Sequence, residues 1–151
     1  MQLQLGKAAC KAQHSQFNLF QPPSPYLPTY HATQADPSSS WAAYIAGCLL
    51  VLARDGPDAP ALAARLAGSS VSVLVQSRVP EGKGVSSSAA VEVATMTALA
   101  GALGVAAEAL PGRQLAILCQ RVENLVVGAP CGIMDQVRVT AQYQCPRKFG
   151  V

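Results

Sequence analysis

The chain has 151 residues, which is long enough for one domain with a hydrophobic core. Its formal net charge is only +3 and its eleven Lys and Arg residues are scattered, so the clustered basic surface of a nucleic-acid-binding protein is not expected. Half of the residues are hydrophobic and only 5% are aromatic, so the core is expected to rely on close packing of small side chains.

The cysteines and histidines exclude several classes of site. No two of the five cysteines are spaced as CxxC, and their odd number and wide spacing do not suggest a disulfide framework or a zinc site. Both histidines, His14 and His31, lie in the N-terminal part, so a His-based metal site is not expected. Residues 1–16 lack the apolar block of a secretory signal, and the apolar run 42–53 is too short to span a bilayer. We therefore expect a cytoplasmic protein without a membrane segment.

The first part of the chain differs in composition from the rest. Residues 1–37 are rich in proline, which interrupts helices and sheet ladders, so a poorly ordered segment is expected there. Apolar residues at helical spacing predict a helix from Trp41 to about Ala53, which Asp55-Gly56-Pro57 would end. A second, short helix is predicted over 58–68.

One strand and two longer helices are predicted in the second half. The β-branched run 71–79 indicates a strand. Because one strand cannot form a sheet, further strands are expected within residues 1–37. From Ser86 to about Leu103 the sequence is apolar nearly all round, with Glu92 as the only charge, so a buried helix is expected. Another helix is predicted from Pro111 to about Val127, and a further turn or helix begins within 131–136.

The loop between the strand and the buried helix has the features of an anion site. Gly82 and Gly84 permit backbone conformations that a Cβ forbids, and three serines stand where the helix begins. A hydroxyl there can cap free N–H groups, and a helix N-terminus favours phosphate. The pattern matches neither a P-loop, nor a dinucleotide-binding fingerprint, nor a nucleophile elbow. From the residues alone, a phosphate loop and a plain strand-to-helix turn are about equally favoured.

Two acidic residues, Glu123 and Asp135, are the only ones after residue 108. Glu123 could be an exposed helix residue paired with Arg121 or Gln120, and Asp135 could be a helix cap. Combined with a phosphate loop, however, they would supply what phosphoryl transfer requires, a carboxylate for Mg²⁺ and another to orient or deprotonate the attacking hydroxyl. Both interpretations stay open at this level.

Four segments together resemble one enzyme family. Pro80 to Ala90 is similar to the second motif of the GHMP kinases, P-x-G-x-G-[LV]-S-S-S-A. Residues 128–136 resemble the galactokinase-type segment that carries the catalytic aspartate, and Val122-Glu123-Asn124 resembles the segment with the metal-binding glutamate. Trp41 to Tyr44 resembles the helix just before the strand. Within the galactokinase-like branch, the run 80–96 is most similar to plant-type kinases of L-arabinose.

The resemblance implies a fold, a reaction and a set of site residues. The fold would be α+β, like the second domain of ribosomal protein S5. The reaction would be transfer of a phosphoryl group from ATP, with Mg²⁺, to the anomeric hydroxyl of a monosaccharide, L-arabinose being favoured. Asp135 would be catalytic, Ser88 and Glu123 would hold the metal, and Cys131 would be structural. The residues around the ATP phosphates would be Gly82, Lys83, Gly84, Val85, Ser86, Ser87 and Ser88.

The resemblance covers residues 38–137. Residues 1–37 lack the family's first motif, and residues 138–151 diverge from the family pattern. We therefore expect the central part of an N-terminal kinase domain, with little activity of its own. A non-catalytic remnant that binds nucleotide or a protein partner is the alternative. A Ser or Cys hydrolase is disfavoured, because no histidine lies near a candidate nucleophile in the sequence.

Overall fold

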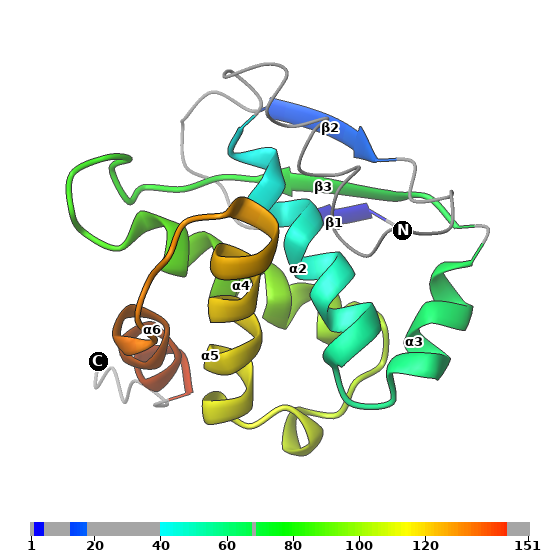
Figure 1. The fold of residues 1–151 in the computed structure, drawn as a ribbon. Coiled ribbons are helices and arrows are strands. Elements are labelled where there is room, and N and C mark those ends of the chain that lie inside the picture. The colour runs from blue at the N-terminus through cyan, green and yellow to red at the C-terminus, as the bar shows by residue number, and fades with distance from the viewer. Residues whose placement is uncertain (1, 5–12, 18–39, 68, 145–151) are drawn as a thin grey trace, which may run out of the picture.

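The computed structural model describes residues 2–4, 13–17, 40–67 and 69–144 (Figure 1). Its described strands form one three-stranded sheet. The strands are β1 (Gln2–Gln4), β2 (Gln13–Phe17) and β3 (Val71–Val75). Strand β3 lies in the middle, parallel to β1 and antiparallel to β2. The expectation of strands within residues 1–37 is thus confirmed. The predicted poor order of the remainder of that segment, and the end of the divergent tail, lie outside the described residues.

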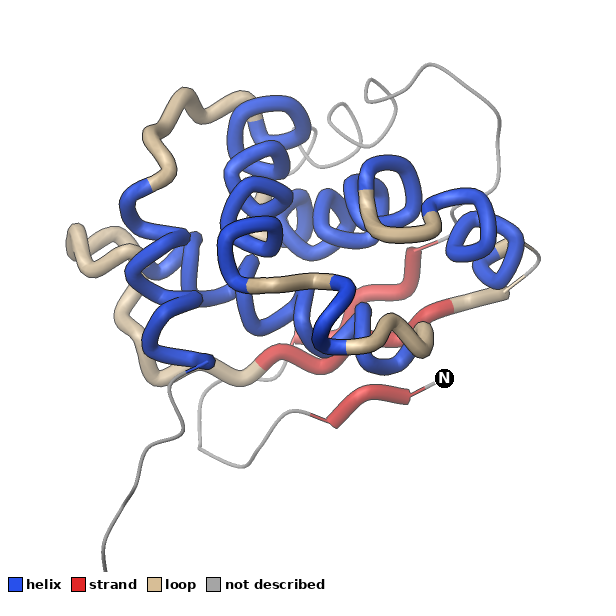
Figure 2. Tube along the Cα trace, turned by 90° about the horizontal axis from the view of Figure 1, so that it is seen from below, coloured by secondary structure: helices blue, strands red, loops and turns tan. Residues whose placement is uncertain are grey.

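The helices lie on one side of this sheet (Figures 1 and 2), which confirms the predicted α+β class. They are α2 (Ala42–Asp55), α3 (Ala59–Leu66), α4 (Ser87–Ala102), the 3₁₀ turn η2 (Ala107–Ala109), α5 (Gly112–Arg121), the π-helical segment η3 (Val122–Val127) and α6 (Met134–Gln144). None of the helices in the described part of the chain is long and apolar enough to cross a membrane.

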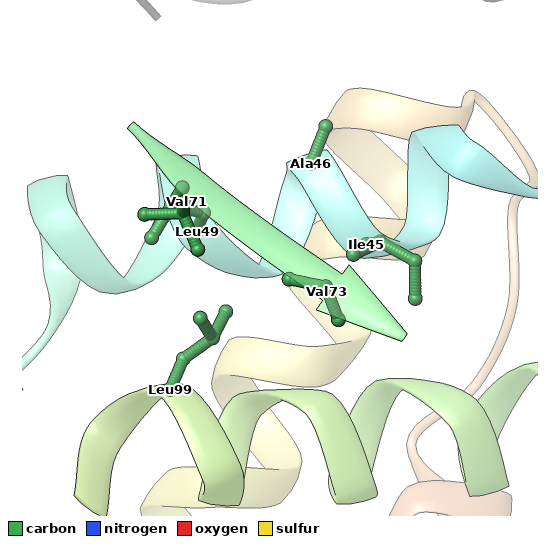
Figure 3. A pocket seen from close by; sticks show the side chains of 6 residues that line it. All are labelled: Ile45, Ala46, Leu49, Val71, Val73 and Leu99. Carbon is green, nitrogen blue, oxygen red and sulfur yellow. The ribbon is translucent and has the colours of Figure 1, made fainter. Parts of the chain in front are cut away.

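Strand β3 packs against helices α2 and α4. Figure 3 shows Val71 and Val73 of the strand facing Leu49 of α2 and Leu99 of α4. Alternation along the strand explains this, because successive side chains point to opposite faces. The small gap among these side chains is lined by apolar atoms alone, so it offers no polar group to hold a polar ligand.

Helix α2 forms the centre of the core and also contacts η3 very closely. A Cβ at Gly47 would lie 2.6 Å from Cγ1 of Val122 and 3.1 Å from Cγ1 of Val126. Both valines are completely buried. The glycine therefore lets the backbone of α2 approach η3, and this contact fixes the segment that carries Glu123.

Two elements differ from their predicted extents. Strand β3 ends at Val75 instead of residue 79, because the described partner strands reach only as far as its residues 74 and 75. The helix predicted over 111–127 changes to π-helical geometry at Val122, and Gly128, with φ of 77°, ends it. Apolar spacing does not distinguish α from π turns, so the change is invisible in the sequence.

Candidate active site

The loop before α4 has a regular alternation of backbone conformation. Gly82, Gly84 and Ser86 have φ angles of 66°, 68° and 58°, whereas Lys83 and Val85 between them do not have positive φ. Where left-handed residues alternate with right-handed ones, successive N–H groups can point to one side and form an anion-binding concavity. A Cβ at either glycine would meet no atom within 4 Å, so the left-handed conformation alone demands glycine there.

The start of α4 leaves its first backbone N–H groups without a side-chain cap. Ser86 occupies the N-cap position, but its left-handed backbone makes no side-chain cap bond. The expected hydroxyl cap is therefore wrong for Ser86. Since the cap bond requires an extended backbone at that position, the positive φ explains its loss. The uncapped N–H groups and the helix dipole remain suited to an anionic ligand.

Three elements meet in a buried polar cluster formed by Glu92, Glu123, Cys131 and Gln136. The amide Nε2 of Gln136 in α6 donates to Oε2 of Glu123 at 2.7 Å and to Oε2 of Glu92 at 3.4 Å. The side chains of Glu92, Gln136 and Glu123 belong to residues that are 0%, 1% and 7% exposed. Since buried carboxylates are costly unless paired, bonded or metal-bound, this amide bridge is what holds the cluster together.

Cys131 joins the cluster from the segment between η3 and α6. Its thiol donates to Oε2 of Glu123, with an S–O distance of 2.7 Å. Its backbone N–H donates to Oδ1 of Asn124 at 2.9 Å, and its carbonyl accepts from Nε2 of Gln120 at 3.1 Å. Hydrogen bonds from α5 and η3 therefore fix the Cys131 backbone, in agreement with the structural role expected from the sequence.

The cluster shifts the titration of its members. Burial, and secondly the charge of Glu123, raise the pKa of Glu92 to about 9, while the hydrogen bond from Gln136 opposes the rise. Burial and the hydrogen bond to Glu123 raise the pKa of Cys131 to about 11. Burial and the two carboxylates also raise the pKa of Tyr44 in α2. Glu92 is thus held as a neutral acid at neutral pH, beside a thiol that stays protonated.

Two oxygen atoms of the cluster have no hydrogen-bond partner in the described structure. They are Oε1 of Glu92 and Oε1 of Gln136, and both are fully buried. Unpaired buried polar atoms are rare and call for an explanation. The carboxyl group of a protonated Glu92 carries a proton that it can donate. The amide oxygen of Gln136 has no hydrogen-bond donor among the described residues.

The residues predicted from the sequence fall into two groups. Glu123 lies in the buried cluster, so its interpretation as an exposed residue is wrong, and Arg121 pairs with Asp55 at 3.1 Å instead. Ser88 precedes Glu92 by four residues in α4, which places it one turn nearer the helix N-terminus on the same face. Helix α4 therefore carries Ser88 near its start and Glu92 one turn later, and Gln136 bonds both Glu92 and Glu123.

Asp135 and the loop residues stand apart from the cluster. Asp135 is exposed in the first turn of α6, directly before the buried Gln136. No side-chain hydrogen bond or ion pair of the described residues involves it. Residues 82–85 are also exposed. Asp135 is the second residue of α6 and makes no cap hydrogen bond within the described part of the chain, so its interpretation as a helix cap is wrong, although an acidic side chain in a first turn is favourable with the helix dipole.

Glu123 and Ser88 carry oxygen atoms of the kind that Mg²⁺ binds. Both hydrogen bonds to Glu123 end on Oε2, and none found among the described residues involves its Oε1. No group of three or more His, Cys, Asp or Glu side chains within the described ranges is arranged as a metal site. Mg²⁺ prefers one or two carboxylates together with substrate phosphates over an all-protein cage. One carboxylate oxygen and the Ser88 hydroxyl match that preference.

Glu92 and Gln136 are members of the site that were not predicted from the sequence. A signal existed for Glu92, because a single charge in an otherwise apolar helix needs a buried partner. No signal existed for Gln136, whose role depends on contacts with residues 13 and 44 positions away.

Comparison with known proteins gives a consistent result. The profile of the family described as GHMP kinases N terminal domain matches residues 39–142. The chain is 57% identical over 102 residues to the L-arabinokinase of Arabidopsis thaliana, a match that covers 68% of this chain and 9% of that protein. It is 48% identical over 99 residues to a galactokinase of Streptomyces coelicolor, covering 64% of this chain and 22% of the relative. A galactokinase of Bos taurus is 37% identical over 117 residues, which are 74% of this chain and 25% of the relative. No solved structure matches the chain significantly.

Proposed function

The chain belongs to the GHMP kinases, and from this premise we propose that it serves in ATP-dependent phosphoryl transfer to the anomeric hydroxyl of a monosaccharide. The matched part spans between 9% and 25% of the length of the relatives named above, so the activity of the whole enzyme is part of the proposal. The observation that carries the proposal is the alternating φ of Gly82 to Ser86, immediately before the uncapped start of α4.

The loop residues would bind the phosphates of ATP. The alternating backbone of residues 82–86 would offer N–H donors, and Lys83 would add a positive charge beside the triphosphate. Ser87 and Ser88 bring two hydroxyl groups to the first turn of α4. The field of this helix favours the same negative charge.

Glu123 and Ser88 would hold Mg²⁺ beside these phosphates. A bound Mg²⁺ supplies positive charge that neutralises the oxygens of the transferred group. Glu123 presents Oε1 while Oε2 is fixed by Cys131 and Gln136. Ser88 contributes its hydroxyl from the start of α4.

Asp135 would act on the sugar. Its exposed position in the first turn of α6 leaves the carboxylate accessible to a substrate hydroxyl. There it would orient the anomeric hydroxyl and accept its proton. L-arabinose is the favoured sugar because of the 57% identity to the L-arabinokinase, and galactose is the competing one. A cytoplasmic location, where ATP is available, belongs to the same proposal.

A nucleotide-binding role without turnover is the second candidate. Leu125, Met134 and Val137 are 50%, 77% and 44% exposed. Exposed large apolar side chains are typical of surfaces that meet another protein. We propose these side chains as the contact with a protein partner in a chain that binds nucleotide without turnover.

A coupled assay for ADP, with MgATP and either L-arabinose or galactose, separates the two candidates. Sugar-dependent turnover that falls by about 10²- to 10⁴-fold in Asp135→Asn supports the kinase. Mg²⁺-dependent ATP binding without turnover would favour the second candidate. Turnover that survives Asp135→Asn at full rate would contradict the assignment of Asp135, and absence of ATP binding would contradict both candidates.

A further inference from the structure

One amide group joins two carboxylates that come from different elements. Gln136 in α6 is 1% exposed, and its Nε2 lies 2.7 Å from Oε2 of Glu123 in η3 and 3.4 Å from Oε2 of Glu92 in α4. An amide oxygen has no proton to donate, whereas the amide nitrogen donates to Oε2 of both side chains, so the nitrogen faces them. The orientation of the Gln136 side chain is therefore set by its two neighbours.

This arrangement restricts the carboxylate of Glu123. Its Oε2 receives two donors, Nε2 of Gln136 and Sγ of Cys131, each at 2.7 Å. A carboxylate held through one oxygen by two donors keeps a fixed rotation, and its other oxygen, Oε1, keeps a fixed direction. The donors come from α6 and from the segment before it, so they hold Glu123 against the body of the domain.

We propose that Gln136 positions Glu123 for divalent-cation binding by anchoring its Oε2, with Glu92 in turn holding the Gln136 amide in place. The inference rests on the proposed function, because it assumes that Glu123 is a cation ligand. It assigns a role to two residues that have no direct part in that function. Residues that orient a metal ligand typically change metal affinity by about 10- to 100-fold when they are replaced.

A purely structural role for Gln136 would have a different signature. Loss of a buried hydrogen bond lowers the stability of the fold whatever the amide does for Glu123. A positioning role in addition lowers cation affinity while metal-free nucleotide affinity stays the same. Thr140 gives a matched control, because it is 3% exposed, lies one turn further along α6 and donates to the carbonyl of Val137.

The test measures Mn²⁺ binding to the full chain in the presence of ADP, from the loss of the electron paramagnetic resonance signal of free Mn²⁺. Gln136→Met keeps the length of the side chain and removes the donor. We expect its Mn²⁺ dissociation constant to rise by at least about tenfold. Binding of ADP in EDTA should be unchanged. Thr140→Val should keep the Mn²⁺ affinity of the parent chain even where its melting temperature falls equally.

A second variant keeps the test decisive if Gln136→Met does not fold. Cys131→Ala removes the other donor to Oε2 at a half-buried position, and we expect a smaller loss of Mn²⁺ affinity, about two- to tenfold. If the parent chain binds Mn²⁺ and the folded variants bind it equally well, the positioning role is refuted and the proposed function stands. If the parent chain binds neither ADP nor Mn²⁺, both are refuted.

Discussion

Two regions of the site owe their conformation to different interactions. They are the exposed loop at residues 80–86 and the cluster of Glu92, Glu123, Cys131 and Gln136. Residues 81–85 of the loop are exposed, and the shape of the loop comes from backbone angles that glycine adopts freely. The cluster consists of contacts between distant residues, and its shape comes from an amide and a thiol that bond one carboxylate oxygen. One region is therefore specified locally, and the other depends on the whole fold.

The largest effect is expected from the charge of Glu92. Its pKa of about 9 in the fold lies above the ordinary value of 4.5, so the folded state favours the protonated acid. Its contribution to stability is complete below pH 4.5 and is lost as the pH rises toward 9, at about 1.4 kcal/mol for each unit of pKa difference. Glu92→Gln, which cannot ionise, should remove this part of the pH dependence.

Urea unfolding at pH 5 and at pH 8.5 measures the effect. The parent chain should lose several times more stability between the two values than Glu92→Gln does. Glu108→Gln, at an exposed glutamate in η2, is the matched control and should behave like the parent. Equal losses in the parent chain and in Glu92→Gln would show that Glu92 is not held as a buried neutral acid.

The same contrast explains what the sequence predicts and what it does not. The helices at Trp41 and Ser86 and the strand at Val71 follow from local spacing, and the glycines at 82 and 84 are visible as a motif. The bridge from Gln136 to Glu92 spans 44 residues, and no periodicity encodes it. The close approach of Gly47 to Val122, at the start of the π-helical segment, is likewise a tertiary contact.

Gly47→Ala tests whether the contact between α2 and η3 supports the cluster. The added Cβ would lie 2.6 Å from Cγ1 of the buried Val122, so the free energy of unfolding should fall by about 1–3 kcal/mol. Gly101→Ala is the control, because a Cβ at this exposed position of α4 meets nothing within 4 Å. That change should stabilise the chain by about 0.5–1 kcal/mol. Similar values for both variants in urea unfolding would mean that η3 shifts freely.

A smaller effect is expected in the loop. Gly82→Ala meets no atom but forces a side chain onto φ of 66°, which should lower stability by about 1 kcal/mol and weaken ATP binding as the concavity opens. Gly132→Ala also meets no atom and has no positive φ, so it should leave both properties unchanged. Calorimetric titration with ATP and urea unfolding measure the pair. Unchanged ATP affinity in Gly82→Ala would contradict a role of this loop in nucleotide binding.

The most direct test of a kinase site shared by the loop and the cluster is calorimetric titration of the chain with ATP, in excess MgCl₂ and in EDTA. We predict that Mg²⁺ tightens ATP binding by at least about tenfold, which corresponds to about 1.4 kcal/mol. Glu123→Gln should abolish this difference and keep the affinity measured in EDTA. Equal affinity with and without Mg²⁺ in the parent chain, or no binding at all, would contradict the account.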